Sequence, residues 1–463
     1  MKVEDIILDE DIYPRQHTSQ VTIESYAEAL RSGAKFPSIE VQKIKDGGVV
    51  RVIVLDGLHR VEAYKLVNRA VIDARYWKDE VLDKVEALED LRIRSLQANL
   101  KHGLRIGERD IGYQATRIVE DRPLEKLKGI GVFLAKKLDV TDTWISKLVG
   151  NVIRSRKQSR DSIIYGMSLS GWTQQEVAGV MGLSQPHVGE IIGKLPSQLF
   201  FKEHESGMSD DDIASQHSLT LPVLWSILLN GKSDLERFEL LDLDNFPYLY
   251  DVWNFSGRDK RFGLEYPGNI PAGIVLNTLY YYTKQGDLVV DPMAGGGVTV
   301  DCCLAMGRKC RAYDITSVRK DIQINNILNG YPDVLKACDL VFVDPPYWSM
   351  RKEHYSKESV SSLSMKDYEA FISHLAGSSY KLLKKGGYLA FLIQNQTGRD
   401  LEELSFIDWA FRSVEKFKQV GFEYIWRIAC PQSMQTATPQ HVDGAKRKKR
   451  LLGLVRDLLI FRK

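Results

Sequence analysis

The sequence predicts an α/β chain in three parts: a small α/β domain, a central all-α region and a C-terminal doubly wound sheet. Short apolar runs alternate with amphipathic helical stretches over residues 246–463, the order typical of a doubly wound, Rossmann-like sheet. Residues 91–245 show helical periodicity with polar faces, and residues 1–90 alternate short strands with helices. A length of 463 residues fits about three domains of ordinary size.

Composition argues against a membrane protein, a secreted protein and a metal site, but it does not indicate a binding partner. The net charge is only +2, from 63 basic and 61 acidic residues, so any nucleic-acid surface must come from local clustering. The five cysteines are odd in number and lack metal-ligand spacing, which indicates reduced core residues and no metal site. Charged residues at Lys2, Glu4 and Asp5 exclude an apolar signal sequence, and no run approaches the roughly 18 apolar residues of a membrane span. We therefore expect a cytoplasmic protein with no membrane partner.

The N-terminal domain carries a candidate anion pocket. Residues 39–42 and 49–55 alternate as strands, and the second strand runs into a turn that opens a helix. A glycine in that turn leaves backbone amides free for an anion, and a histidine and an arginine add positive charge at the helix start. The predicted nucleotide or phosphate pocket consists of Asp56, Gly57, His59 and Arg60. Solvated helix residues are the competing interpretation.

The central region contains three copies of a helix-turn-helix pattern. Each copy has an alanine in its first helix, a tight turn four residues later, and a Ser or Thr before the second helix; the alanines are Ala135, Ala178 and Ala214. Alanine permits close crossing of helices, and the hydroxyl residue caps the second helix. The third copy places apolar residues where a DNA reader needs polar ones, which favours a packing role or a surface for a partner.

The middle copy is the best candidate for reading DNA. Thr173 and Glu176 have capping-box spacing, and Gly182 occupies the turn. The second helix is expected to present Gln185 and His187 to base edges, and Lys194 follows toward the phosphates.

A buried strand followed by a proline corner is the main candidate for chemistry. Residues 340–343 are apolar and continue into Asp344, Pro345, Pro346 and Tyr347. The prolines donate no backbone N–H and make the turn rigid, so carboxylate and carbonyl acceptors lie beside an aromatic ring. Such acceptors suit the exocyclic amine of a planar base, whereas an ordinary strand end is the competing interpretation.

A second strand end upstream has the form of a nucleoside site. Residues 287–291 read as a strand that breaks into Gly295, Gly296 and Gly297, and a helix follows. Asp314 lies 19 residues beyond Gly295 at the end of another strand, the usual place for an acidic residue on ribose hydroxyls. The loop lacks the dinucleotide G-x-G-x-x-G pattern, and there is no P-loop.

Residues 266–463 resemble the amino-methylating DNA methyltransferases that use S-adenosyl-L-methionine. The resemblance lies in Asp-Pro-Met-Ala-Gly-Gly-Gly-Val-Thr at 291–299, Asp-Pro-Pro-Tyr at 344–347 and Pro-Gly-Asn-Ile-Pro at 267–271. It implies that the Asp-Pro-Pro-Tyr residues are catalytic. It also implies cofactor contacts from Pro271, Asp291, Pro292, Ala294, Gly295, Gly297, Thr299, Asp314 and Asn325, with Asn326 in place of the last as a second possibility.

The N-terminal domain resembles the domain shared by ParB partition proteins and sulfiredoxin. The residues that carry this likeness include Tyr-Pro-Arg at 13–15 and Ser-Leu-Gln-Ala-Asn at 95–99. Sulfiredoxin has its cysteine where this chain has Leu58, which excludes that chemistry. Gly-Leu-His-Arg at 57–60 also departs from the Glu-Arg-Arg signature of the partition proteins, leaving a nucleotide or phosphate pocket as what the likeness implies.

Further elements of the C-terminal domain follow in the order that this fold requires. Helices are expected at 270–282, through 304, at 366–383 and at 407–420; further strands are expected near 310–314, 322–324, 387–393, 424–429 and 456–461. The loop over 348–365 is expected to act as a lid. A second loop ends in a basic cluster expected to contact phosphate, formed by Lys446, Arg447, Lys448, Lys449 and Arg450.

These features predict methylation of the N6 amine of adenine in duplex DNA, with the base flipped out of the helix. Cytosine N4 is the close rival, because its amine needs the same acceptors. A non-catalytic ParB-like DNA-binding regulator and an RNA methyltransferase are two further hypotheses. Duplex DNA is the expected partner, and a homodimer is left open.

Overall fold

The computed structural model describes residues 1–15, 18–101, 106–243, 246–255, 257–333, 335, 337–348, 359–397, 406–432, 439–447, 449 and 451–463. The chain divides into two compact units, Met1–Lys157 and Gln158–Lys463. The boundary falls within one long helix, α6 (Asp142–Leu169). Each unit has its own hydrophobic core and is described separately.

The first unit begins with a small mixed sheet. Its strand order is β1-β3-β2-β4, with β5 paired beside β2, and both predicted strands are present as β2 and β3. Helices α1 and α2 pack on each other, and Ala27, Leu30 and Ala63 are buried between them. The elements are η1 (Val3–Asp5), β1 (Ile6–Ile7), α1 (Gln20–Arg31), β2 (Ile39–Asp46), β3 (Val49–Asp56), α2 (Leu58–Leu66), β4 (Ala74–Tyr76) and β5 (Leu82–Asp83).

Helices complete the first unit. Ser95 and Asn99 on α3 donate hydrogen bonds to the Leu55 carbonyl at 2.7 and 2.8 Å, which fixes α3 against the end of β3. The remaining helices share a core with α3 through Leu96, Ile118 and Leu134. The elements are α3 (Lys84–Lys101), α4 (Glu108–Asp121), η2 (Leu124–Lys126), α5 (Ile130–Leu138) and the first part of α6.

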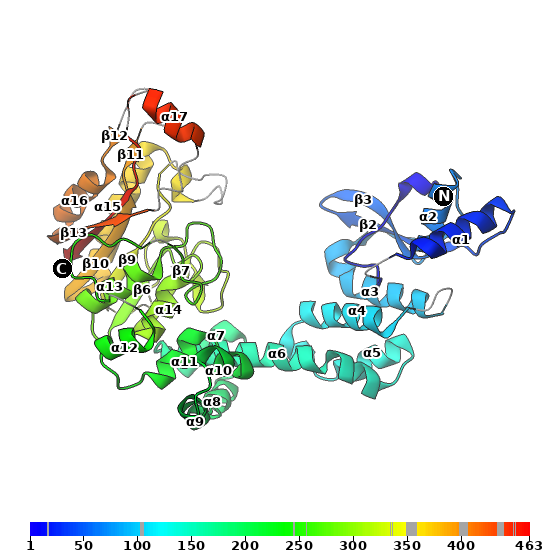
Figure 1. Ribbon diagram of the computed structural model, residues 1–463, viewed down its shortest axis with the longest axis horizontal. Helices are drawn as coiled ribbons and strands as arrows, with labels where there is room; N and C mark the ends of the chain where they lie inside the picture. Colours follow the sequence, from blue (N-terminus) through cyan, green and yellow to red (C-terminus); the bar gives the residue numbers. More distant parts are fainter. Residues whose placement is uncertain are drawn as a thin grey trace. The chain divides into compact units, whose positions relative to one another are not determined.

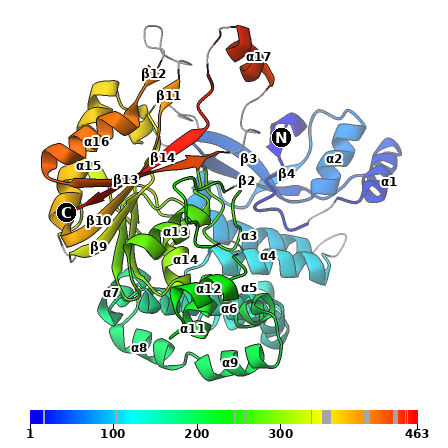
Figure 2. The same cartoon turned by 60° about the vertical axis from the view of Figure 1, so that its left-hand side comes forward.

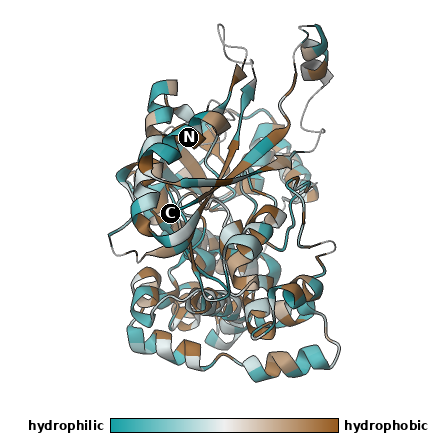
Figure 3. Cartoon of the chain, turned by 90° about the vertical axis from the view of Figure 1, so that its left-hand side faces the viewer, coloured by the Kyte–Doolittle hydropathy of each residue, from teal (hydrophilic) through white to brown (hydrophobic). Residues whose placement is uncertain are grey.

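Short helices open the second unit, and three left-handed turns recur along the chain at the positions that the repeat predicts. Asp139, Gly182 and Ser218 each end a helix with positive φ, at 58°, 65° and 54°. The helices drawn in the lower part of Figure 3 carry both hydrophilic and hydrophobic residues, as expected for helices with one buried face. The elements are α7 (Gln174–Met181), α8 (Gln185–Gly193), α9 (Ser197–Glu205), α10 (Asp210–His217), α11 (Leu221–Leu228) and α12 (Asp234–Leu240).

The larger sheet of the second unit has seven strands in the order β13-β14-β10-β9-β6-β7-β8. The five strands from β10 to β8 are parallel, and β14 runs antiparallel between β10 and β13. Strands β6, β7 and β8 extend the sheet one way, and the chain then returns to place β9 on the other side of β6 (Figure 1). This reversal makes a topological switch point between β6 and β9, and it confirms the predicted Rossmann-like sheet.

Helices cover both faces of this sheet. Helices α13 and α14 bury Ile274 and Cys302 against one face, whereas α15 and α16 bury Phe371 and Phe417 against the other (Figure 2). The elements are α13 (Ala272–Tyr282), β6 (Leu288–Asp291), α14 (Val298–Ala305), β7 (Lys309–Asp314), β8 (Ile322–Ile324), η3 (Ile327–Asn329), β9 (Cys338–Val343), η5 (Val360–Ser362), α15 (Met365–Leu382), β10 (Leu383–Gln394), β11 (Gln396–Thr397), β12 (Phe406–Ile407), α16 (Trp409–Val420), β13 (Glu423–Pro431), α17 (Pro439–Arg447) and β14 (Val455–Arg462). No helix in the described residues is long and apolar enough to cross a membrane.

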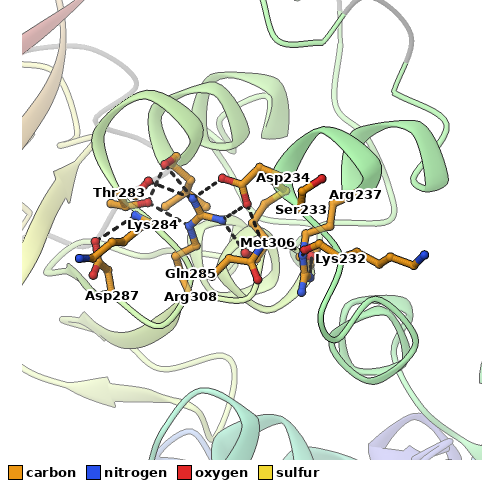
Figure 4. Close-up of polar contacts among 12 residues, drawn as sticks. Lys232, Ser233, Asp234, Arg237, Thr283, Lys284, Gln285, Asp287, Met306 and Arg308 are labelled. Atoms are coloured by element: carbon orange, nitrogen blue, oxygen red, sulfur yellow. Dashed lines mark hydrogen bonds and ion pairs between the residues drawn. The ribbon is translucent and has the colours of Figure 1, made fainter.

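A buried arginine fastens the helical segment to this fold. The Arg308 side chain is fully buried and donates to Asp234 of α12 at 2.7 Å and to the Thr283 hydroxyl at 3.0 Å (Figure 4). It also donates to the carbonyls of Met306 and Leu279. Helix α11 adds apolar contact, because Val223 and Trp225 belong to the core formed with α14. The third helical copy therefore packs on the sheet domain, as its apolar residues predicted.

Replacing Arg308 by Met is expected to destabilise the second unit by roughly 3 to 5 kcal/mol, because Asp234 loses its buried partner. The matched control is Arg462→Met, which removes an ion pair with Glu423 whose side chains are 46% and 58% exposed. That control is expected to leave the free energy of unfolding almost unchanged, because the pair is screened by solvent. Urea unfolding followed by tryptophan fluorescence measures both, and equal small losses would contradict a fastening role for Arg308.

Candidate active site

Both predicted corners lie at the same edge of the sheet. Strands β6 and β9 are parallel neighbours, with Val289 beside Leu340 and Val290 beside Val341, so their carboxyl ends coincide. The glycine loop leaves β6 at Asp291, and the proline corner leaves β9 after Val343. The carboxyl edge at a switch point is the usual ligand site of a doubly wound sheet.

The glycine loop is held in shape by the acidic residue at the end of β7. The Asp314 carboxylate accepts the Gly295 N–H at 2.9 Å and the Thr316 N–H at 3.2 Å. Gly295 and Gly297 have φ values of +49° and +86°, where glycine avoids the strain of a side chain. Gly295 and Asp314, which lie 19 residues apart in the sequence, are therefore in direct contact in the fold.

Asp291 is buried at the base of the loop. Its carboxylate accepts the Met293 N–H at 2.9 Å and a hydrogen bond from the Thr299 side chain. Burial raises the pKa of Asp291 to about 7, opposed by those two donors, and the charges of Asp314 and Asp344 raise it further. The three carboxylates that the sequence singled out therefore lie near enough to interact.

The Pro-Gly-Asn-Ile-Pro motif at 267–271 and the residues just before it lie against the glycine loop. The Leu264 N–H donates to the Gly296 carbonyl at 2.8 Å, and the Asn269 side chain donates to the Leu264 carbonyl at 2.6 Å. A Cβ at Gly295 would lie 3.0 Å from the Tyr266 ring, so the segment covers one side of the loop. Pro271 then caps the start of α13, and Pro292 is buried just after β6. Ala294 donates its N–H to the Tyr313 carbonyl at 2.9 Å.

Asn325 lies at the end of β8, where its backbone N–H donates to the Asp314 carbonyl at 2.9 Å. Its side chain donates to the Gly330 carbonyl at 3.0 Å. The position is next to the acidic end of β7, although part of the amide already has a partner.

The oxygen acceptors of the proline corner are the Asp344 carboxylate and the carbonyls of Pro345 and Pro346. Tyr347 donates its hydroxyl to Asp344 at 2.9 Å. The Pro346 carbonyl accepts from Tyr368 at 3.4 Å, whereas the Pro345 carbonyl accepts no hydrogen bond from the described residues. Burial raises the pKa of Asp344 to about 6, while the charge of Arg456 and the Tyr347 hydroxyl lower it.

Three charged residues that support this site were not assigned roles from the sequence. Asp301 on α14 accepts the Gly263 N–H at 2.7 Å and pairs with Arg319, whose guanidinium lies over Gly297. Arg456 is 7% exposed on β14 and influences Asp344 across the sheet. For Arg456, the sequence offered one signal: Arg456 and Asp457 interrupt the otherwise apolar run 454–461.

The predicted DNA-contacting residues lie in two places. On α8, Gln185 is exposed and His187 is partly exposed, with its ring 3.8 Å from Glu190; Lys194 is exposed at the C-cap just beyond the helix. Lys446 and Arg447 are exposed in the last turn of α17, and Lys449 is exposed just beyond it. Lys448, Arg450 and residues 349–358 of the expected lid lie outside the described residues. Helix α17 connects β13 to β14 at the carboxyl edge of the parallel strands.

The predicted N-terminal pocket belongs to the first unit. Gly57 has φ +97° and starts α2, and the Arg60 guanidinium donates to Asp56 at 2.7 Å and to the Pro37 carbonyl at 2.7 Å. His59 is buried and accepts the Ser19 N–H at 3.0 Å, and burial lowers its pKa. These contacts organise the turn, and binding of a nucleotide or phosphate stays a prediction.

Comparison with known proteins agrees with the glycine-loop part of this site. Residues 225–325 match the family model of the N6- and N4-directed enzymes described as DNA methylase. This match includes the glycine loop and Asp314. It supports the expectation of a methyltransferase whose cofactor is S-adenosyl-L-methionine, and it covers adenine and cytosine enzymes alike. No curated protein sequence matches the chain.

Solved structures of low similarity include several methyltransferases. TrmN from Thermus thermophilus is 12% identical with a TM-score of 0.26, over 42% of this chain and 50% of its own. A DNA modification methylase, also from Thermus thermophilus and solved with S-adenosyl-L-methionine, is 20% identical with a TM-score of 0.21, over 30% of this chain and 51% of its own. A methyltransferase from Pyrococcus furiosus is 15% identical with a TM-score of 0.26, over 43% and 87%. The chain thus spans about half the length of the first of these relatives.

The raised pKa of Asp344 gives a test of the buried site that needs no substrate. Because the folded pKa of about 6 exceeds the ordinary value of 3.8, the folded state holds the proton more tightly than the unfolded state. The stabilisation that this contributes is complete below about pH 4 and is lost as pH rises through 6. Wild type should therefore lose stability relative to Asp344→Asn between about pH 4 and pH 7, as measured by urea unfolding. A difference that stays constant over this range would show that Asp344 is not buried as described.

Proposed function

We propose that this protein transfers the methyl group of S-adenosyl-L-methionine to the N6 amine of adenine in duplex DNA. The observation that carries the proposal is the common edge of β6 and β9, where a glycine loop and an Asp-Pro-Pro-Tyr corner end side by side. Asp rather than Ser at position 344 favours adenine, because the sequence there resembles the adenine enzymes more. Cytosine N4 is the second candidate, and the DNA methylase match includes it.

The residues at the glycine loop suit this cofactor. Asp314 offers carboxylate oxygens at the end of β7, next to the loop whose Gly295 N–H it accepts. A carboxylate has about four lone-pair sites and can accept from several donors at once, which suits ribose hydroxyls, and the side-chain-free loop permits close approach of a ligand to backbone. Bound there, S-adenosyl-L-methionine supplies an electrophilic methyl group. Asp291, Pro292, Ala294, Gly297, Thr299, Pro271 and Asn325 are the remaining proposed contacts.

The proline corner would hold the amine. The Asp344 carboxylate and the Pro345 carbonyl accept the two amine hydrogens, which directs the nitrogen lone pair toward the methyl donor. Tyr347 is tied to Asp344 through its hydroxyl, so its ring is fixed beside the position of the base. Pro346 keeps the corner rigid, since its carbonyl is held by Tyr368. The rate gain then comes mainly from orientation, and Asp344 receives the proton that the amine loses.

Sequence specificity and affinity for DNA would come from two groups of residues, one on and just after α8 and one at the end of α17 and in the basic run that follows it. Gln185 and His187 lie at the start of α8, where side chains can reach base edges. Lys194, Lys446, Arg447, Lys448, Lys449 and Arg450 would neutralise phosphates. Residues 1–90, which resemble the ParB domain, are proposed as an accessory nucleotide- or phosphate-binding part.

Incubation with methyl-labelled S-adenosyl-L-methionine and duplex DNA, followed by digestion to nucleosides, tests the activity. We expect label on N6-methyladenine in wild type, and a loss of about 100-fold or more in Asp344→Ala, because one amine acceptor is gone. Cofactor binding measured by calorimetry should survive this change. Label on N4-methylcytosine would establish the second candidate, and no label on DNA would overturn the proposal in favour of a non-catalytic regulator or an RNA enzyme.

Substitutions on α8 test its role. Gln185→Ala should reduce discrimination between sites by about 1 to 3 kcal/mol, because one base contact is removed. Lys194→Ala should weaken binding to all duplexes alike and lower the salt dependence of binding by about one ion. Asp211→Ala, at an exposed position on α10, is the matched control. Fluorescence anisotropy with short duplexes measures these effects, and unchanged binding in both variants would remove α8 from the DNA interface.

A further inference from the structure

Arg456 is a buried cation whose donors are not all used within the described part of the chain. The residue is 7% exposed, yet its Nε has no hydrogen-bond partner, and no ion pair is formed with it among the described residues. Leaving a charged donor buried without an acceptor costs free energy, because the group loses its hydrogen bonds to water. Its neighbour Asp457 differs, because it pairs with Arg427 at 2.9 Å. A buried arginine with an unused donor on this strand therefore points to a further partner, such as a ligand.

The sheet register places Arg456 beside the proline corner. Strand β14 pairs with β10 so that Arg456 lies opposite Gln394, and β10 pairs in turn with β9, with Phe391 opposite Val343. Side chains alternate between faces along a strand. Phe342, Leu392 and Leu458 all belong to the core on the α13 and α14 face, so Asp344, Gln394 and Arg456, each two residues along, share that face at the carboxyl edge.

The electrostatics agree with this placement. The charge of Arg456 lowers the pKa of Asp344 and that of the Tyr347 hydroxyl, which burial and Asp344 otherwise raise. The guanidinium is therefore near both groups of the corner. It approaches from the β10 and β14 side, whereas the glycine loop lies on the β6 and β7 side. The corner stands between them.

We infer that Arg456 contacts the target base and donates a hydrogen bond to the ring nitrogen next to the carbon that bears the amine. This inference rests on the proposed function. In adenine that atom is N1 and in cytosine it is N3, and both are acceptors beside the amine that Asp344 would hold. One carboxylate acceptor and one guanidinium donor then match the donor and acceptor of the same base edge. A DNA phosphate is a poorer partner, because the phosphates stay outside while Arg456 is buried, and the cofactor lies across the corner.

This contact would explain selection of a correctly oriented base. A hydrogen bond from a charged donor is stronger than one from a neutral donor, and a base turned over in the pocket would leave both Arg456 and Asp344 without partners. Arg456 would thus act as a positioning and specificity residue, and Asp344 would remain the group that meets the reacting amine.

The test is a double-mutant cycle between protein and DNA. The substrate is a duplex carrying either the natural base at the labelled position or its analogue without that ring nitrogen, 1-deazaadenine or 3-deazacytosine. The variants are Arg456→Met and Arg456→Lys, with Arg462→Met, at the exposed end of the same strand, as the control. Methyl transfer under single-turnover conditions and cofactor binding are measured for each pair.

Wild type and Arg462→Met should each lose about 10- to 100-fold on the analogue. Arg456→Met should lose a similar factor on the natural base and nothing further on the analogue, with cofactor binding retained. Loss of the nearby positive charge should also raise the pKa of Asp344. As the pH is lowered, the activity of Arg456→Met should therefore begin to fall at a higher pH than that of wild type. Arg456→Lys should restore the pH profile more than the discrimination, since a lysine keeps the charge without the fixed fork.

Two results would overturn the inference. If wild type transfers methyl groups equally well to the natural base and the analogue, Arg456 does not use that nitrogen, whatever the variants do. If Arg456→Met is slow and the analogue slows it by a further factor equal to that of wild type, the two groups do not interact. Absence of label on the natural duplex in wild type would instead count against the proposed function, so the two failures are distinguishable.

Discussion

Parallel pairing of β6 with β9 is the constraint on which the site depends. The chain reverses its direction across the sheet between these strands, so two segments about fifty residues apart end at one edge. Helices α13 and α14 on one face and α15 and α16 on the other bury most of the central strands β6 and β9. Because no helix can cover the switch point itself, the loops that leave β6 and β9 remain together and available to a ligand.

Buried carboxylates fix the conformation of these loops by accepting hydrogen bonds from their backbone. Asp314 accepts a backbone N–H from Gly295, Asp301 accepts one from Gly263 and pairs with Arg319, and Asp291 accepts one from Met293. Each carboxylate converts an otherwise flexible glycine-rich turn into a defined one, since a charged acceptor holds its donor more strongly than a neutral one. The raised pKa values of Asp291 and Asp344 follow from the same burial.

The helical segment before the sheet domain belongs to the same compact unit. Arg308 joins α12 to the ends of α13 and α14, and Arg311 on β7 stacks on Trp172, with its guanidinium 4.3 Å from the ring centre, while also pairing with Glu176 of the α7 capping box. The pair α7 and α8 is thereby connected directly to the strand that carries Asp314. A DNA-reading role for α8 would therefore place recognition and chemistry in one compact unit.

The sequence by itself determined the strands, the glycine loop and the proline corner, because each is specified by local residue types: β-branched apolar runs, glycines at positive φ, and prolines that end a strand. It also placed the three left-handed turns at Asp139, Gly182 and Ser218, and the capping box at Thr173 and Glu176. Only the tertiary structure decided which charged residues far apart in the chain meet. Arg456 lies more than a hundred residues beyond Asp344, and the pairing of β14 with β10 and of β10 with β9 brings the two residues to the same edge of the sheet. Arg319 lies over Gly297 because β8 pairs beside β7. Register and burial are collective properties of the packed sheet, so no local pattern could reveal those partners.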